Sequence, residues 1–134
     1  MTDPGFEPSV PFSDTDINEI EAELGRKLPD SYCKFVKSYG GAFVGGLVDG
    51  SGDLPVLHFY GASKKGGVLD QLRLHTDLKE DRILPIARCE LGNLYVFDQE
   101  NAVHYINYYG GRTSARKVAD SFQEFIDRII VTEE

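Results

Sequence analysis

The chain has 134 residues, 41% of them hydrophobic and 27% charged, values that fit one globular domain and exclude a fibrous or disordered chain. Lys and Arg number 14 and Asp and Glu number 22, so the formal net charge is −8. This balance excludes non-specific binding to nucleic acid or to anionic lipid, and it favours either steering toward a basic protein or simply solubility.

The termini and the cysteines indicate the compartment. The first residues form no basic and apolar leader, and no apolar run approaches the roughly 20 residues of a membrane span. Cys33 and Cys89 lie too far apart for a metal motif and are too few for a disulfide framework. We therefore expect a cytoplasmic protein with two structural thiols.

Two helices are predicted after a proline-rich lead-in at residues 1–12. Ser13 and the acids behind it are typical of a helix start, and Gly25 is typical of a helix stop. The second helix runs from Pro29, in its first turn, to Tyr39. The outer face of the first helix is acidic and consists of Asn18, Glu19, Glu21 and Glu23.

The rest of the chain is rich in predicted strands, with a final helix. Strands are expected over residues 42–44, 46–48, 55–60, 83–87, 93–98 and 102–108, with a short helical face from Val68 to His75. The last helix is capped by Asp120 or Ser121, and its apolar face is predicted to be Phe122, Phe125, Ile126 and Ile129. This order predicts a single α+β domain, with a mostly antiparallel or mixed sheet flanked by two N-terminal helices and a C-terminal helix.

Chemistry-bearing residues do not combine into a known catalytic pattern. The histidines His58, His75 and His104 have no metal-ligand spacing, and no serine lies in a nucleophile motif. The lysines of residues 61–67 precede their glycines, which is the wrong order for a phosphate loop. Asp98 ends an apolar strand and is either an acid–base group or, as we favour, a turn residue that binds its own backbone. We predict no catalytic, cofactor-binding or metal-binding residue.

Tyrosines gather near two predicted strand ends and leave two interpretations open. Tyr105, Tyr108 and Tyr109 crowd one strand end, and Tyr60 ends another. Tyrosine is typical of protein interfaces because it offers a large contact area at a low entropy cost. A sheet core would also hold these rings, and the sequence favours neither interpretation.

Four blocks of sequence, in order, resemble the SUKH superfamily, the Smi/Knr type of domain. They are ELGRKLPDSY at residues 23–32, ILPIA at 83–87, GNLYVFD at 92–98 and VADSFQEFI at 118–126. The resemblance places the domain at residues 13–131, between a lead-in at 1–12 and a tail at 132–134. Two segments depart from the family pattern. Residues 103–107 lack the tryptophan and the acid that often follow, and residues 61–81 have no counterpart.

The resemblance implies a binding protein without chemistry of its own. Bacterial members resemble immunity proteins, which neutralise toxin domains of polymorphic or contact-dependent systems, and many such toxins are nucleases. Fungal members resemble regulatory scaffolds with long flanks, which this chain does not show. The implied partner is a cognate and basic toxin domain, bound by a monomer or weak dimer, with no nucleic acid and no membrane.

The residues expected to contact the partner come from the acidic helix, the strand ends and the aromatic set. They are Glu19, Glu23, Tyr60, Asp98, His104, Tyr105, Tyr108 and Tyr109. A small-ligand-binding or regulatory module is the alternative, suggested by the glycines at the sheet entrance and by polar residues such as Asp98 and His104. An enzyme is disfavoured.

Overall fold

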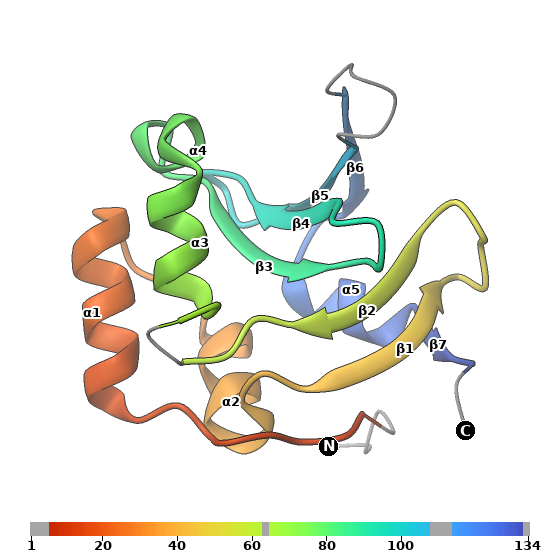
Figure 1. Cartoon of the computed structure of the whole chain (residues 1–134), viewed down its shortest axis with the longest axis horizontal. Helices are drawn as coiled ribbons and strands as arrows, with labels where there is room; N and C mark the ends of the chain where they lie inside the picture. The colour runs from red at the N-terminus through yellow and green to blue at the C-terminus, as the bar shows by residue number, and fades with distance from the viewer. Residues whose placement is uncertain (1–5, 63–64, 108–113, 133–134) are drawn as a thin grey trace.

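The structure of the chain, a computed structural model, describes residues 6–62, 65–107 and 114–132. Over these residues, seven strands form one curled sheet in the order β6-β5-β4-β3-β2-β1-β7, and every neighbouring pair is antiparallel (Figure 1). The helices are α1 (Asp14–Leu24), α2 (Asp30–Tyr39), α3 (Val68–Leu74), α4 (Thr76–Glu80) and α5 (Phe122–Asp127). The strands are β1 (Phe43–Val48), β2 (Pro55–Phe59), β3 (Leu84–Arg88), β4 (Leu94–Phe97), β5 (Val103–Asn107), β6 (Ser114–Ala119) and β7 (Ile129–Val131). The predicted single α+β domain is confirmed.

The helix ends follow the local chemistry of the sequence. The Ser13 side chain accepts a hydrogen bond from the Asp16 N–H, and the Asp16 carboxylate accepts one from the Ser13 N–H, which together form a capping box. Gly25 ends α1 in the left-handed conformation, with a φ of 82°. Ser121 caps α5 by accepting from the Glu124 N–H, and Pro29 stands at the N-cap of α2, one position before the predicted first turn.

Two predicted boundaries are wrong, each for a physical reason, and a third falls on a residue outside the described ones. The two strands predicted at 42–44 and 46–48 form one strand, β1, which begins at Phe43, because the positive φ of 58° at Gly45 makes a bulge within the strand and does not end it. Ile129 begins β7 and does not continue the α5 helix, because it pairs with Val48 across the sheet. The predicted strand at 102–108 is described only to Asn107, since Tyr108 lies outside the described residues.

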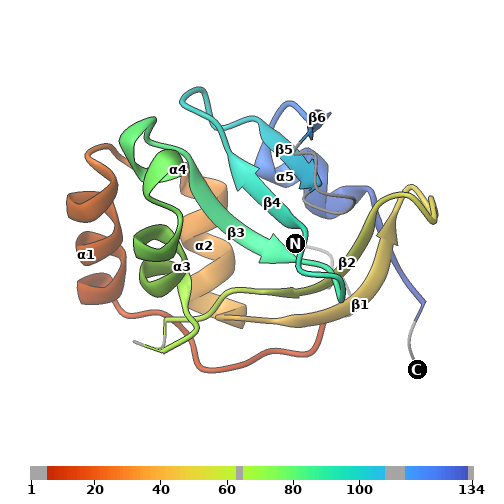
Figure 2. The same ribbon diagram turned by 45° about the horizontal axis from the view of Figure 1, so that its top comes forward.

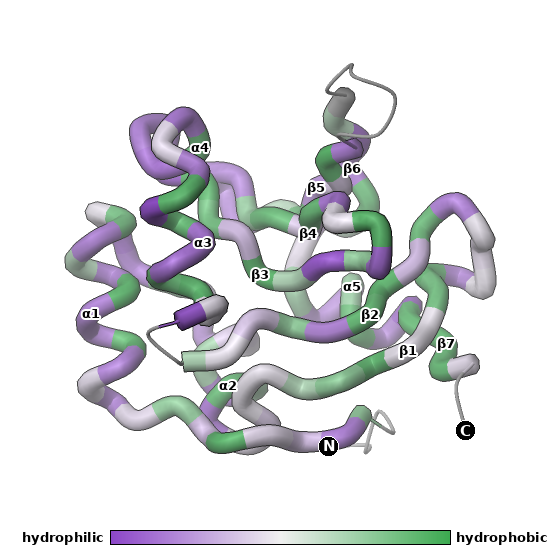
Figure 3. Tube along the Cα trace, viewed as in Figure 1, coloured by the Kyte–Doolittle hydropathy of each residue, from purple (hydrophilic) through white to green (hydrophobic). Residues whose placement is uncertain are grey.

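Besides β7, two elements were not predicted at all. The edge strand β6 has exposed Arg116 and Lys117 in its middle, so it lacks the apolar alternation that indicates a strand. The helix α4 is only five residues long and mostly hydrophilic (Figure 3), so its sequence shows no apolar face of helical period.

The core lies between the sheet and the helices α2 and α5, which cover the same face (Figure 2). Its centre is aromatic. The Phe35 ring lies 4.9 Å from that of Phe59 and 5.3 Å from that of Phe122, and the Tyr32 ring lies 5.3 Å from that of Phe97. Such ring pairs add about 0.5–1.5 kcal/mol each beyond the area they bury. The helix α3 packs between α1 and β3, at one end of the strands.

Within the described residues, the helices are too short and too polar to cross a bilayer.

Candidate protein-binding surface

The structure separates the predicted contact residues into a buried group and an exposed group. Tyr60 and Tyr105 are only 4% and 7% exposed, so the expectation that they are exposed anchors does not hold. Tyr105 pairs with Tyr95 across β4 and β5, on the face that packs against α5, and for this reason it belongs to the core. Tyr108 and Tyr109 lie outside the described residues.

The phenol of Tyr105 takes part in a buried polar contact. Its hydroxyl oxygen accepts a hydrogen bond from Asn93 Nδ2 at 3.0 Å and lies 3.7 Å from Cys89 Sγ. Burial, followed by the Cys89 contact, raises the pKa of Tyr105 to about 12, so the phenol stays neutral at physiological pH. This arrangement supports the core interpretation of Tyr105.

Asp98 and His104 form a half-buried pair at the turn between β4 and β5. Asp98 Oδ1 accepts the N–H groups of Glu100 at 2.8 Å and Ala102 at 3.0 Å, and Asp98 Oδ2 lies 2.8 Å from His104 Nε2. Burial raises the pKa of Asp98, but the hydrogen bonds from His104 and the backbone outweigh it, so the pKa falls below its usual value. The prediction of a turn residue that binds its own backbone is confirmed, because Asp98 Oδ1 accepts two backbone N–H groups of the turn.

Arg26 connects this turn to the end of α1. Its Nη2 donates to the Asp98 carbonyl at 2.6 Å, its Nε donates to the Arg82 carbonyl at 3.0 Å, and its Nη1 donates to Asn101 Oδ1. A charged residue in a loop is usually solvated, so the sequence alone gives no signal of this role. The guanidinium brings α1, the start of β3 and the β4–β5 turn to the same end of the molecule.

The acids of α1 differ in whether they have a partner. Glu23 accepts from Arg73 Nε and from Lys79 Nζ, each at 3.1 Å, and these bonds, Arg73 first, lower its pKa. Glu21 accepts from the Leu28 N–H at 2.8 Å. Glu19 is exposed and has no hydrogen bond or ion pair with any described residue. Of the two predicted glutamates, Glu19 is therefore the one that a partner can reach.

A second group of acids, which the sequence analysis did not single out, lies beside the β4–β5 turn. Gln99 Nε2 donates to the Asp81 carbonyl at 2.6 Å, which fixes this turn against the end of α4. Four exposed acids here form no hydrogen bond or ion pair through their side chains within the described part of the chain. We name them the acidic end, and they are Asp77, Glu80, Asp81 and Glu100. The acids between Asp77 and Asp81 were a usable signal in the sequence, but the position of Glu100 beside them is decided by the fold.

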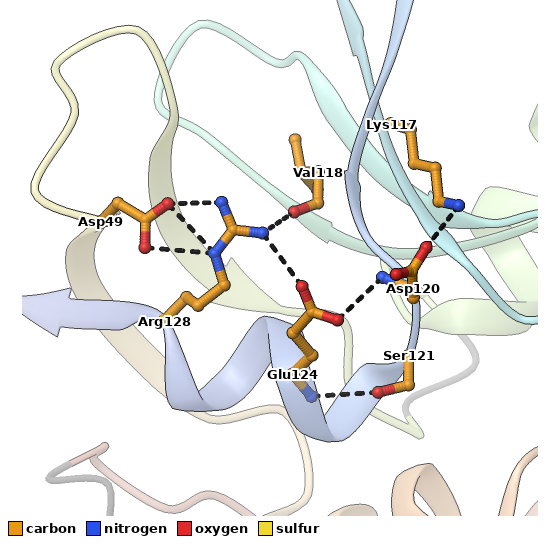
Figure 4. Close-up of polar contacts among 7 residues, drawn as sticks. All are labelled: Asp49, Lys117, Val118, Asp120, Ser121, Glu124 and Arg128. Atoms are coloured by element: carbon orange, nitrogen blue, oxygen red, sulfur yellow. Dashed lines mark hydrogen bonds and ion pairs between the residues drawn. The ribbon is translucent and has the colours of Figure 1, made fainter.

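Acids around the end of α5 are, in contrast, paired with cations of the chain itself. Figure 4 shows Arg128, at the end of α5, donating to both carboxylate oxygens of Asp49 and to the carbonyl of Val118. The same guanidinium reaches Glu124 at 3.4 Å, and Lys117 pairs with Asp120. These contacts connect the β1–β2 turn to α5 and β6, so this network is structural. Its carboxylates are already paired with cations of the chain, and they are therefore less available to a basic partner.

Among the described residues, no three His, Cys, Asp or Glu side chains lie close enough together to hold a metal ion.

Cys33 is half-buried, and burial, followed by its acidic neighbours Glu21 and Asp30, raises the pKa of its thiol. Its thiol is therefore a poor nucleophile at neutral pH.

Comparison with known proteins connects the chain to one family. The model of the SMI1 / KNR4 family (SUKH-1) matches residues 11–128. The matched span runs from just before α1 to the end of α5, and it includes Arg26, the acidic end and the β4–β5 turn. No curated protein matches the chain.

Proposed function

The chain belongs to the SMI1/KNR4 (SUKH-1) family, and on this premise we propose that it is a bacterial immunity protein without catalytic activity. The family supports an immunity-type role and a protein partner. The partner that we propose is a cognate toxin domain of a polymorphic or contact-dependent system, with a basic surface such as that of a nuclease. The chain neutralises this toxin in the cytoplasm by covering it.

The observation that carries this proposal is the difference between the two groups of acids. Asp49, Glu124 and Asp120 are paired with cations of the chain itself, whereas the acidic end is exposed and without ion pairs among the described residues. A basic partner surface would supply the missing cations. Complementary charges of this kind raise the association rate and orient the encounter.

Glu19, Asp98 and His104 have distinct parts in this proposal. Glu19 adds one more exposed carboxylate, in the middle of α1 and beside the start of α3. Asp98 and His104 hold the turn that carries Glu100, so they act through its position and are not proposed to touch the toxin themselves.

The test is the association rate with the toxin domain encoded beside the gene of this chain. We expect the double variant Glu80→Gln/Glu100→Gln to lower the association rate constant about tenfold at low salt, with little change in dissociation. The association rate constant of the wild-type protein should fall toward that of the variant as the salt concentration rises, because salt screens surface charges. Stopped-flow measurements over a series of salt concentrations give the association and dissociation rate constants.

The matched control carries the same loss of charge elsewhere. Asp53 and Glu90 are exposed acids without ion pairs among the described residues, and they lie outside the acidic end. Asp53→Asn/Glu90→Gln should change the association rate less than twofold. Equal losses in both double variants would reject the acidic end as the contact, and a folded wild-type protein that fails to bind the toxin or to protect growth would reject the immunity role.

A second candidate function, a small-ligand-binding module, is favoured by one observation. A hollow of about 390 Å³ lies on the side of the sheet away from α5, between the strands and α3, and it is lined in part by His58, His75 and Arg88. Its volume is within the range of small-ligand pockets. A rise in melting temperature with one metabolite, together with indifference to toxin domains, would favour this function.

A further inference from the structure

We infer that the hollow beside α3 is a binding site for an oxyanion, a phosphate or carboxylate group of a small molecule, with Arg88 as the residue that contacts it. The inference does not depend on the immunity role. It rests on the position of Arg88, on the hydrogen bonds of its guanidinium and on the charge of the residues around it.

The register of three strands places Arg88 on the face of the sheet opposite the aromatic core. Arg88 pairs with His58 of β2 on one side and with Leu94 of β4 on the other. Paired residues of neighbouring strands point to the same face, so these three side chains share one surface. The next pair, Phe59 with Ala87, points to the opposite face, where Phe59 packs against α2 and α5.

Helix α3 closes the other side of the hollow. Gln71 and His75 are four residues apart, so they lie on one side of this helix and its C-cap, and both line the hollow. Tyr60 adds an aromatic wall, its ring edge-on to that of His58 with 5.7 Å between the centroids. Gly66 and Gly92 complete the rim and leave it open, because neither carries a side chain.

His58 orients the guanidinium of Arg88 and leaves most of its donors available. Arg88 Nε donates to His58 Nε2 at 2.8 Å, while His58 Nδ1 lies 3.0 Å from the Phe59 carbonyl oxygen. These two contacts fit an imidazole that accepts at Nε2 and donates from Nδ1. No other hydrogen bond of the Arg88 side chain exists within residues 6–62, 65–107 and 114–132, so the four N–H groups on Nη1 and Nη2 have no protein acceptor there.

The charge around the hollow favours an anion. None of the residues that line it is an aspartate or glutamate, in a chain whose net charge is −8. The neighbouring acid Asp70 is engaged, since its Oδ2 accepts the Gly66 N–H at 2.8 Å. A half-buried guanidinium with its terminal nitrogens available matches the two oxygens of a phosphate or carboxylate, and the side-chain amide of Gln71, which also lines the hollow, provides a further hydrogen-bonding position.

The test is a titration of the full-length protein with inorganic phosphate and, separately, with citrate, which distinguishes phosphate from carboxylate ligands. Sodium chloride at equal ionic strength is the blank. We expect saturable shifts of the Arg88 Nε–H signal in the NMR spectrum with at least one of the two anions, and none with chloride. The absence of a saturable shift with both anions would overturn the inference.

Two variants locate the site. Arg88→Gln should weaken anion binding at least tenfold, and Gln71→Glu, which adds a carboxylate inside the hollow, should weaken it by a similar factor while Arg88 remains. Arg116→Gln removes the same charge from exposed β6 and should change binding less than twofold. Equal weakening by Arg116→Gln would show a general charge effect and would reject the site. Since no toxin is present, failure here leaves the immunity role intact, and failure of toxin binding leaves this result intact.

Discussion

At the scale of single residues, Tyr32 and Tyr95 are both buried, but they differ in whether the hydroxyl group has a hydrogen-bond partner. Both are fully buried by surface area, and burial raises the pKa of each phenol, so both stay protonated. The Tyr95 hydroxyl donates to the Pro55 carbonyl at 2.9 Å. The Tyr32 hydroxyl has no hydrogen-bond partner among the described residues. An unsatisfied buried hydroxyl is a cost, whereas a satisfied one is a small gain.

Replacing each tyrosine by phenylalanine should therefore change the free energy of unfolding in opposite directions. Tyr32→Phe removes only the unsatisfied hydroxyl and should stabilise the protein by about 1 kcal/mol. Tyr95→Phe removes a hydrogen bond and leaves the Pro55 carbonyl without its donor, so it should destabilise by about 1 kcal/mol. Urea unfolding of the two variants measures this, and a loss of stability in Tyr32→Phe would contradict the structure.

At the scale of elements, the end of α2 depends on a close approach between segments distant in the sequence. Gly40 follows α2 with a φ of 64°, and a Cβ atom built on it would overlap the backbone carbonyl of Val10 in the lead-in. The Ser9 N–H donates to the Tyr39 carbonyl and the Phe12 N–H to the Val36 carbonyl, so the lead-in lies directly on this helix. A side chain at position 40 would force the two backbones apart.

A comparison of two glycines separates this contact from backbone strain alone. Gly92 also has a positive φ, of 85°, but a Cβ atom there would meet no atom within 4 Å. Gly92→Ala should cost about 1–2 kcal/mol, the ordinary cost of a left-handed alanine. Gly40→Ala should cost at least twice as much or prevent folding, as thermal unfolding would show. Equal losses would mean that the lead-in does not lie against α2.

At the scale of the whole molecule, carboxylates with lowered pKa values make the fold sensitive to acid. The pKa values of Asp98, Glu23, Asp49 and Asp120 all lie below their usual values because each accepts hydrogen bonds in the folded state. A group with a lowered folded pKa stabilises the protein above its unfolded pKa and loses this contribution as the pH falls through the folded value. Stability should therefore decline below about pH 4, the ordinary range of carboxyl titration.

Asp98→Asn tests one part of this decline. The variant should be less stable than the wild type at pH 7, because the carboxylate that accepts hydrogen bonds from the turn and contacts His104 is lost, and its stability should fall less steeply below about pH 4. Asp53→Asn, at an exposed position without an ion pair among the described residues, should follow the wild type. Chemical unfolding across this pH range provides the measurement, and an equally steep decline in Asp98→Asn would contradict the assignment.

Local chemistry explains what the sequence by itself determined. The capping box at Ser13, the stop at Gly25 and the apolar faces of α1, α2 and α5 depend on residues within a few positions of each other, so they were readable along the chain. The turn role of Asp98 was readable for the same reason, since its acceptors serve Glu100 and Ala102. Family membership was also visible, because four blocks lie in order along the sequence.

Only the tertiary structure decided which polar residues are paired within the described part of the chain and which stay exposed. Arg26 reaches a turn far along the chain, Lys79 and Arg73 neutralise Glu23, and the fold brings Glu100 beside α4. Burial of Tyr105 and the position of Arg88 on the outer face of the sheet follow from strand register, which depends on long-range pairing. The sequence gives the number of acidic residues in the chain. The contacts made in the fold determine which of these acids are paired with a cation and which remain exposed.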